Sequence, residues 1–98
     1  MTLMNNYAVF RRHAWRDSAE LERAASRSIR IGQEEMADRV RWLRSYVCEE
    51  EDGTLGSVCI FQAVDPDAII EHARRARLTC DAVLPISRTV IVTDDPTR

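Results

Sequence analysis

The segment from residue 40 to residue 67 contains two strand-like apolar stretches, joined by a turn and followed directly by a helix start. Residues 39–49 and 57–63 are rich in β-branched and aromatic side chains, and Asp52-Gly53 between them favours a turn. Asp65-Pro66-Asp67 then offers a capping carboxylate, a proline at the first helical position and an acid near the positive end of the helix dipole. A β-hairpin that leads into a capped helix therefore restricts the possible folds more than any other feature.

Further elements precede and follow this unit. Residues 7–12 predict a first strand, and Asp17, three residues before Glu20, is close to a capping box that opens a helix reaching about Met36. The second helix is expected to end near Arg77, and a last strand is expected at about residues 83–92. The order β-α-β-β-α-β predicts a ferredoxin-like α+β sandwich, in which a four-stranded antiparallel sheet carries two helices on one face.

Size, charge and cysteine content exclude several classes of protein. The 98 residues are 45% hydrophobic and predict a single domain over residues 1–98, with an ordered core at about 7–92 and polar tails. We find no membrane-length apolar run and no signal peptide, so no membrane association and a cytoplasmic location are expected. The net charge of -2 argues against nucleic-acid binding. Three cysteines without a CxxC pair predict free thiols, including Cys48 and Cys59.

Strict alternation along the two hairpin strands places apolar side chains on both faces of the predicted sheet. On the second strand one side would carry Val40, Trp42, Tyr46 and Cys48, and the other Leu43 and Val47. Two helices cover only one face, and a large exposed apolar face marks an interaction site. We therefore predict a homodimer that packs through the open sheet face. The alternative is a ligand-binding or partner-binding face on a monomer.

Several segments carry a resemblance to a known family. They are residues 40–47 (VRWLRSYV), residues 58–61 (VCIF), Ala63, Asp65-Pro66 and residues 71–74 (EHAR). The chain resembles the small bacterial domains of unknown-function family 4242, often labelled nickel-binding-protein-like, from the first strand to the closing Asp-Pro-Thr. The resemblance implies a ferredoxin-like fold, a tendency to dimerise and binding of a divalent transition metal, nickel above all.

The chain departs from the pattern of that family at two places. Members suited to metal binding tend to have His in the second strand, where this sequence has Leu43 and Arg44. A Gly-aromatic-Pro segment usually follows the second helix, where residues 77–79 are Arg-Leu-Thr.

The candidate metal ligands are dispersed along the sequence. A nickel or zinc site needs three or four nitrogen, sulfur or oxygen donors. His13, His72, Cys59 and Glu71 could supply them only if tertiary packing brings them together, because no HxH or CxxC spacing preorganises a pair. For His72, on the flank of the second helix, the alternative is a half-buried residue bonded to the backbone.

A second set of candidates suggests an anionic ligand. Arg44 would lie in the apolar row with Trp42 and Tyr46, where a charge needs a carboxylate from a partner subunit or from a small anionic ligand. With His72 these side chains form the predicted ligand-binding set. The leading hypothesis is a small-ligand or metal-binding module. One alternative is a small isomerase, cyclase or monooxygenase with His72 or His13 as acid-base, and another is a structural or partner-binding subunit.

Overall fold

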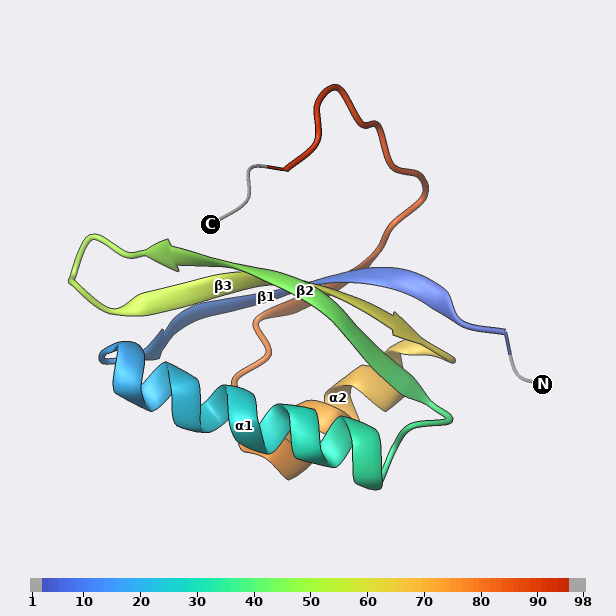
Figure 1. The fold of residues 1–98 in the computed structure, drawn as a ribbon, viewed down its shortest axis with the longest axis horizontal. Helices are drawn as coiled ribbons and strands as arrows, with labels where there is room; N and C mark the ends of the chain where they lie inside the picture. The colour runs from blue at the N-terminus through green and yellow to red at the C-terminus, as the bar shows by residue number, and fades with distance from the viewer. Residues whose placement is uncertain (1–2, 96–98) are drawn as a thin grey trace.

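The computed structural model describes residues 3–95, which form one antiparallel sheet and two helices. In chain order the elements are β1 (Asn5–Trp15), α1 (Ser18–Glu34), β2 (Val40–Glu49), β3 (Leu55–Ala63), α2 (Pro66–Ala76) and β4 (Ala82–Pro85). The strands lie in the order β2-β3-β1-β4, and both helices cover the same face of the sheet (Figure 1). The predicted ferredoxin-like α+β sandwich is confirmed. Residues 96–98, the end of the expected polar tail, lie outside the described residues.

The helices begin and end where short-range signals in the sequence predict. The side chain of Asp17 accepts a hydrogen bond from the backbone N of Glu20 at 2.9 Å, and that of Asp65 accepts one from Ala68 at 2.8 Å. Each bond satisfies an amide that the first helical turn leaves free. At the other end of α2, Arg77 has a φ of 57°, and its backbone N–H bonds back to the last turn. This left-handed residue ends the helix.

The hydrophobic core lies between the sheet and the helices. Alternate residues of β1 and β3 point into this layer, among them Val9 and Phe61, which are 0% and 1% exposed. From α2 the core receives Ala68, Ile69 and Ala76. The small alanine side chains allow α2 to approach the sheet closely.

The predicted alternation along β2 is wrong in its second half. Trp42 pairs with Phe61, but Arg44 pairs with the next residue of β3, Ile60, so Leu43 is an extra residue. This β-bulge reverses the alternation, because two residues of β2 oppose one of β3. Trp42 therefore faces the helices, whereas Arg44 and Tyr46 face the opposite, open side of the sheet.

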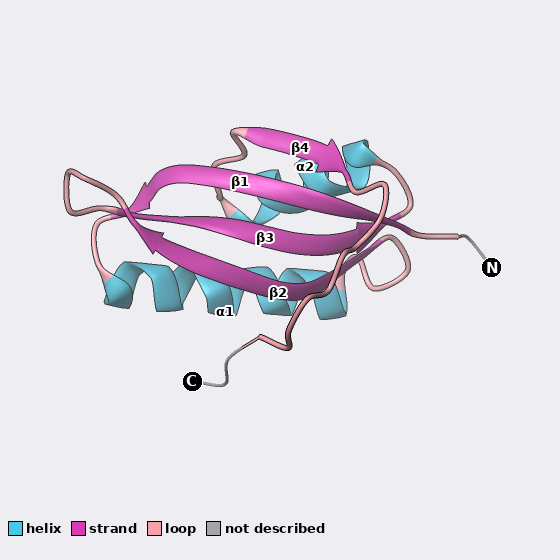
Figure 2. Cartoon of the chain, turned by 90° about the horizontal axis from the view of Figure 1, so that it is seen from above, coloured by secondary structure: helices cyan, strands magenta, loops and turns pink. Residues whose placement is uncertain are grey.

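The last strand is shorter than predicted. It covers only Ala82–Pro85, and residues 86–95 run across the open face without pairing in the sheet (Figure 2). Pro85 pairs with Tyr7, and β1 begins only two residues before Tyr7, at Asn5, so a longer β4 would soon have no strand to pair with. We call residues 86–95 the C-terminal arch. Arg44 and the Tyr46 hydroxyl both donate hydrogen bonds to Asp95, which ties the end of the arch to β2.

A wide bulge in β1 depends on a glycine in β3. Arg11 pairs with Ser57 and Trp15 with Leu55, so Gly56 alone lies opposite three residues of β1. A Cβ atom at Gly56 would lie 2.6 Å from the backbone oxygen of Arg11 and 2.6 Å from a carboxylate oxygen of Glu50. No side chain fits at this position without displacing the backbone of β1.

Gly56→Ala is therefore expected to lower the free energy of unfolding by about 1–3 kcal/mol, the usual cost of overpacking. Gly32→Ala in α1 is the control, because its Cβ would meet only His72 Nε2 at an ordinary 3.8 Å. This control should raise the free energy of unfolding by about 0.5–1 kcal/mol through helix propensity. Urea unfolding measures both, and equal effects of the two substitutions would contradict the proposed close contact.

Candidate functional site

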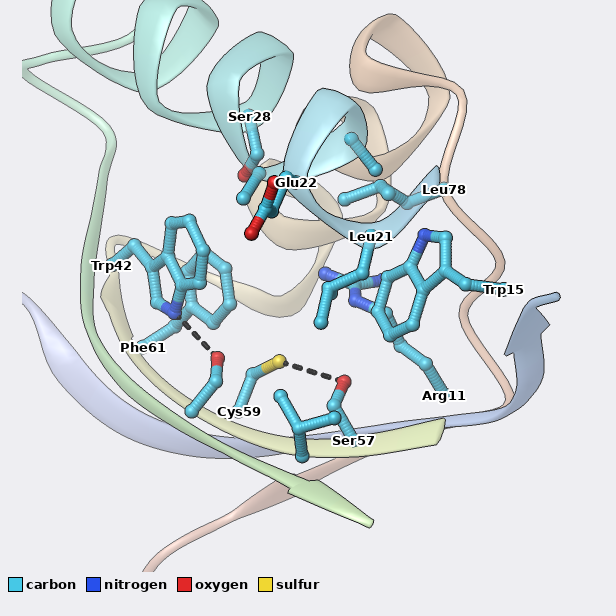
Figure 3. Close-up of a pocket in the computed structure, with 14 residues that line it drawn as sticks. Arg11, Trp15, Leu21, Glu22, Ser28, Trp42, Ser57, Cys59, Phe61 and Leu78 are labelled. Atoms are coloured by element: carbon cyan, nitrogen blue, oxygen red, sulfur yellow. Dashed lines mark hydrogen bonds between the residues drawn. The ribbon is translucent and has the colours of Figure 1, made fainter. Parts of the chain in front are cut away.

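A cavity of about 230 Å³ lies between α1 and the strands β1, β2 and β3. Its lining is mainly apolar and includes Trp15, Leu21, Ala25, Trp42 and Phe61. Figure 3 shows the side chains of Trp15, Leu21, Trp42 and Phe61, from three strands and one helix, around the same space. For comparison, an apolar cavity of about 150 Å³ in another protein is large enough to hold benzene. This cavity is therefore large enough for a small organic molecule.

Aromatic rings form much of the cavity wall. Trp42 and Phe61 are stacked, with an interplanar angle of 8° and ring centroids 6.1 Å apart. The indole nitrogen of Trp42 donates a hydrogen bond of 2.7 Å to the Ser45 hydroxyl. The bulge in β2 makes this bond possible, because it brings position 45 rather than 44 to the face of Trp42. The ring of Trp42 is thus held in place by the stacking with Phe61 and by the hydrogen bond to Ser45.

Arg11 is the buried charged residue of the site. It comes from β1 and is 1% exposed, and its guanidinium carbon lies 6.0 Å from the centroid of the Phe61 ring. Nη1 donates to the backbone oxygen of Thr79, whereas Nη2 has no hydrogen-bond partner among residues 3–95. The sequence analysis did not select this residue. The burial of Arg11 could have been predicted from the sequence, because Arg11 alternates with Tyr7 and Val9 on the face that the helices cover.

His72 lies beside the cavity but is not part of its lining. Its Nε2 is 3.0 Å from the backbone oxygen of Ser28, which can only accept, so Nε2 carries the proton. Burial lowers the pKa of His72, the Ser28 carbonyl raises it, and the charge of Arg11 lowers it. The imidazole is therefore neutral near pH 7. Its Nδ1 has no partner within the described residues, and the ring packs against Phe61 at 5.5 Å.

The carboxylate of Glu50 holds the bulge of β1, and with it Trp15 at one end of the cavity. It accepts two hydrogen bonds of 2.8 Å from the Arg12 guanidinium and one of 2.9 Å from the backbone N–H of His13. His13 has a φ of 49°, which a residue other than glycine adopts at some conformational cost. The Arg12 bonds and the His13 amide hold the pKa of Glu50 at about 2.

This low pKa predicts a loss of stability in acid. Because the pKa of Glu50 falls from 4.5 to about 2 on folding, its ionised form favours the folded state above pH 4.5. That contribution should be lost as the pH falls from 4.5 toward 2. In urea unfolding across this range, Glu50→Gln should show a shallower pH dependence and lower stability at pH 7. Glu51→Gln, in the same turn, is the control, and an identical pH dependence in the two variants would contradict the role of Glu50.

The predicted ligand-binding set does not form one site. Trp42 faces the cavity, whereas Arg44 and Tyr46 lie on the open face of the sheet. Arg44 does have the carboxylate partner that the sequence analysis required, but this partner is Asp95 of the same chain. The side chains of Arg44 and Asp95 are about half exposed, so they tie down the arch and do not line an enclosed pocket.

The predicted metal ligands do not converge. Cys59 and His72 are buried on the helix side of the sheet, and Glu71 is paired with Arg74 and Arg75 on the outer side of α2. Within residues 3–95, no three His, Cys, Asp or Glu side chains are arranged to hold a metal ion. All three cysteines are free, as predicted, but Cys48 is exposed, whereas we expected buried thiols.

His13 lies near two carboxylates that are already occupied. Its Nδ1 is 3.1 Å from Asp52, whose other oxygen accepts from the amide and hydroxyl of Thr54. Its Nε2 is 3.9 Å from Glu50, which is bound to the Arg12 guanidinium. A cation here would meet a fixed positive charge and carboxylates with few free lone pairs. The described residues of a single chain therefore do not form a complete nickel site on their own.

These features define a ferredoxin-like α+β domain with an apolar cavity between its layers. Residues 7–86 match the model of the family described as nickel responsive protein SCO4226-like, and the chain belongs to this family. No curated protein and no solved structure matches the chain significantly. In the part of the chain that the structure describes, neither helix has the length and apolar character needed to cross a membrane.

Proposed function

We propose that this protein is a small-ligand-binding module whose site is the cavity between α1 and the sheet. The observation that carries the proposal is the cavity of about 230 Å³, bordered by Trp15, Trp42 and Phe61. Small-molecule sites are typically concave and mostly apolar, with a few placed polar groups. A space of this size beside an ordered aromatic wall is best explained by a molecule that enters it. A cytoplasmic location is part of the same proposal.

Two alternatives fit the cavity less well. An enzyme with a histidine acid-base needs His13 or His72 in the cavity, but neither is among its lining residues. A purely structural subunit would have side chains filling this space, as in an ordinary core. Binding without catalysis agrees with both the composition of the lining and the free volume.

The proposal is tested by the fluorescence of the protein, because both tryptophans in the sequence line the cavity. Titration with phenylacetamide, a neutral aromatic probe close to the cavity in size, should change the emission in a saturable way. Valeramide, a neutral non-aromatic amide, is the control and should bind less tightly. Phenylacetate, which has nearly the same shape but carries a negative charge, is the second aromatic probe. The proposal is overturned if neither phenylacetamide nor phenylacetate gives a saturable response.

A divalent metal site is the second candidate, favoured by the description of the family as nickel responsive. Of the two predicted histidine ligands, His13 has the exposed ring, and it lies on β1 beside the turn between β2 and β3. Calorimetric titration of the protein with Ni²⁺ tests this candidate, with His13→Ala as the variant. A stoichiometric response of the native protein that is lost in His13→Ala would support a metal site. No response from the native protein would rule the metal site out.

We further propose that the protein is a homodimer through the open sheet face and the C-terminal arch. Apolar side chains on this side of the sheet include Phe10, Ile60 and Leu84, and Leu84 is 53% exposed. The arch adds three consecutive apolar residues, 90–92, that are 74–92% exposed. Such a contiguous apolar surface on one side is typical of a protein interface. A second copy would cover it with the same surface.

Ile91→Asp is expected to shift the protein from dimer to monomer, because it places a charge in the proposed interface. Ile70→Asp is the matched control. Ile70 is 52% exposed but lies on α2, on the opposite side of the sheet. Analytical ultracentrifugation at micromolar concentration should give a dimer for the native protein and for Ile70→Asp, and a monomer for Ile91→Asp. A monomeric native protein would contradict the proposal.

A further inference from the structure

Arg11 places an unneutralised positive charge at the wall of the cavity. The residue is 1% exposed, and none of the carboxylates in residues 3–95 forms an ion pair with it. Its Nη1 bonds to the backbone oxygen of Thr79, but Nη2 has no partner. Figure 3 shows the guanidinium of Arg11 extending from its strand toward the space beside Leu21 and Trp15.

An arginine side chain stays charged in proteins, so this charge cannot be removed by loss of a proton. A buried charge is expensive unless it is paired and its donors are satisfied. The contact with the Phe61 ring, at 6.0 Å, offsets only a small part of this cost. The site therefore lacks one negative charge.

The neighbouring side chains do not supply that charge. Glu22 also lines the cavity, but it is exposed and makes no ion pair with Arg11 within the described chain. Ser57 and Cys59 bond to each other at 3.2 Å. Burial raises the pKa of the Cys80 thiol, so Cys80 is neutral near pH 7. No carboxylate among residues 3–95 pairs with Arg11, and a bound anion would supply the missing charge.

We infer that the ligand is a small aromatic monocarboxylate and that Arg11 binds its carboxylate. This inference rests on the proposed function, since it assigns the chemical class of the ligand in the same cavity. Nη2 of Arg11 is buried just beneath the cavity lining, so a small movement of the side chain toward the cavity would let it donate to one carboxylate oxygen. The stacked rings of Trp42 and Phe61 offer an apolar surface for the aromatic body.

The dimensions and polarity of the cavity favour this class over others. A volume of about 230 Å³ exceeds what benzene needs and suits a benzoate-sized or phenylacetate-sized molecule. An inorganic phosphate would need several donors for its oxygens, and the cavity offers one buried guanidinium among apolar walls. The single charge of the ligand matches that of Arg11, which is the buried charged residue of the lining, whereas Glu22 is exposed.

Isothermal calorimetry with phenylacetate and phenylacetamide tests the inference at pH 7. The two probes have nearly the same shape, but only phenylacetate carries a charge. Phenylacetate should bind the native protein about 10- to 100-fold more tightly, the usual gain from a hydrogen bond to a charged group. Sulfate should bind more weakly than phenylacetate, because it leaves the aromatic walls uncovered.

Arg11→Gln should remove the preference for phenylacetate over phenylacetamide, while binding of phenylacetamide continues. Arg23→Gln is the matched control, because Arg23 is exposed on α1 and outside the cavity lining. It should retain the preference of the native protein. If Arg11→Gln does not fold, the ratio of the two affinities in the native protein still decides.

The possible failures are distinguishable. Equal affinities for phenylacetate and phenylacetamide in the native protein would overturn the role of Arg11 but leave the cavity as a binding site. Sulfate that binds as tightly as phenylacetate would overturn the aromatic part of the inference. Failure of both aromatic probes to bind would overturn the proposed function together with the inference.

Discussion

Ala25→Leu is expected to weaken the binding of phenylacetate roughly 50-fold and to raise the stability of the ligand-free protein. Ala25 is half-buried on α1 and lines the cavity. Leucine adds three carbons that would occupy part of the cavity in place of the ligand. The binding free energy lost is about 0.8 kcal/mol for each carbon, or about 2.4 kcal/mol in all. The same carbons leave water on folding, so the free energy of unfolding should increase. Calorimetry and urea unfolding measure the two effects.

Ala19→Leu is the control for this prediction. Ala19 is exposed near the start of the same helix, so its substitution adds the same atoms outside the cavity. Both the affinity and the stability should stay close to those of the native protein. The prediction fails if Ala25→Leu and Ala19→Leu bind phenylacetate equally well, or if Ala25→Leu is less stable than the native protein.

Phe61→Ala is expected to lower the free energy of unfolding by about 3–5 kcal/mol. Phe61 is 1% exposed on the inner strand β3, and its ring contacts Trp42, His72 and Arg11. Alanine would enlarge the existing cavity and expose the stacked face of Trp42. Since domains have a total stability of about 5–15 kcal/mol, this variant should be only marginally folded at room temperature.

Phe61→Leu separates the volume of the side chain from the stacking of its ring. Leucine preserves much of the volume, so the loss should be below about 1.5 kcal/mol. Urea unfolding of the two variants, followed by circular dichroism, provides the comparison. A cost below about 1 kcal/mol for Phe61→Ala would show that this part of the core is loosely packed and would contradict the described contacts.

The order of the elements could be predicted from the sequence because it depends on short-range signals. Asp17 and Asp65 each cap a helix through a bond to a residue three positions later. The alternation in β3 is regular and places Cys59 and Phe61 on the same buried face. Such signals involve residues only a few positions apart in the sequence, so they can be recognised without knowledge of the tertiary packing.

The arrangement of the site depends on long-range contacts and was predicted only in part. The bulge at Leu43 separates Trp42 from Arg44 and Tyr46, and a one-residue shift of this kind leaves no clear mark in the sequence. The end of β4 depends on where its partner β1 begins, far away in the chain. Arg11 was overlooked because arginine is almost never fully buried, although its position in the alternation of β1 pointed inward.

The family description and the structure lead to different ligands. The family is described as nickel responsive, whereas the candidate donors His13, His72, Cys59 and Glu71 are dispersed over the fold. The cavity instead combines apolar walls with one buried guanidinium. The proposal of an organic anion follows the second observation, because the chemistry of the lining residues determines what can bind there.

The location of bound phenylacetate tests the central claim most directly. Nuclear Overhauser effects between the ring protons of phenylacetate and an isotope-labelled protein would identify the residues that it contacts. We expect contacts with Trp15, Trp42 and Phe61, together with a shift of the side-chain resonances of Arg11. Contacts confined to the open face near Arg44 and Tyr46, or none at saturating phenylacetate, would contradict the claim.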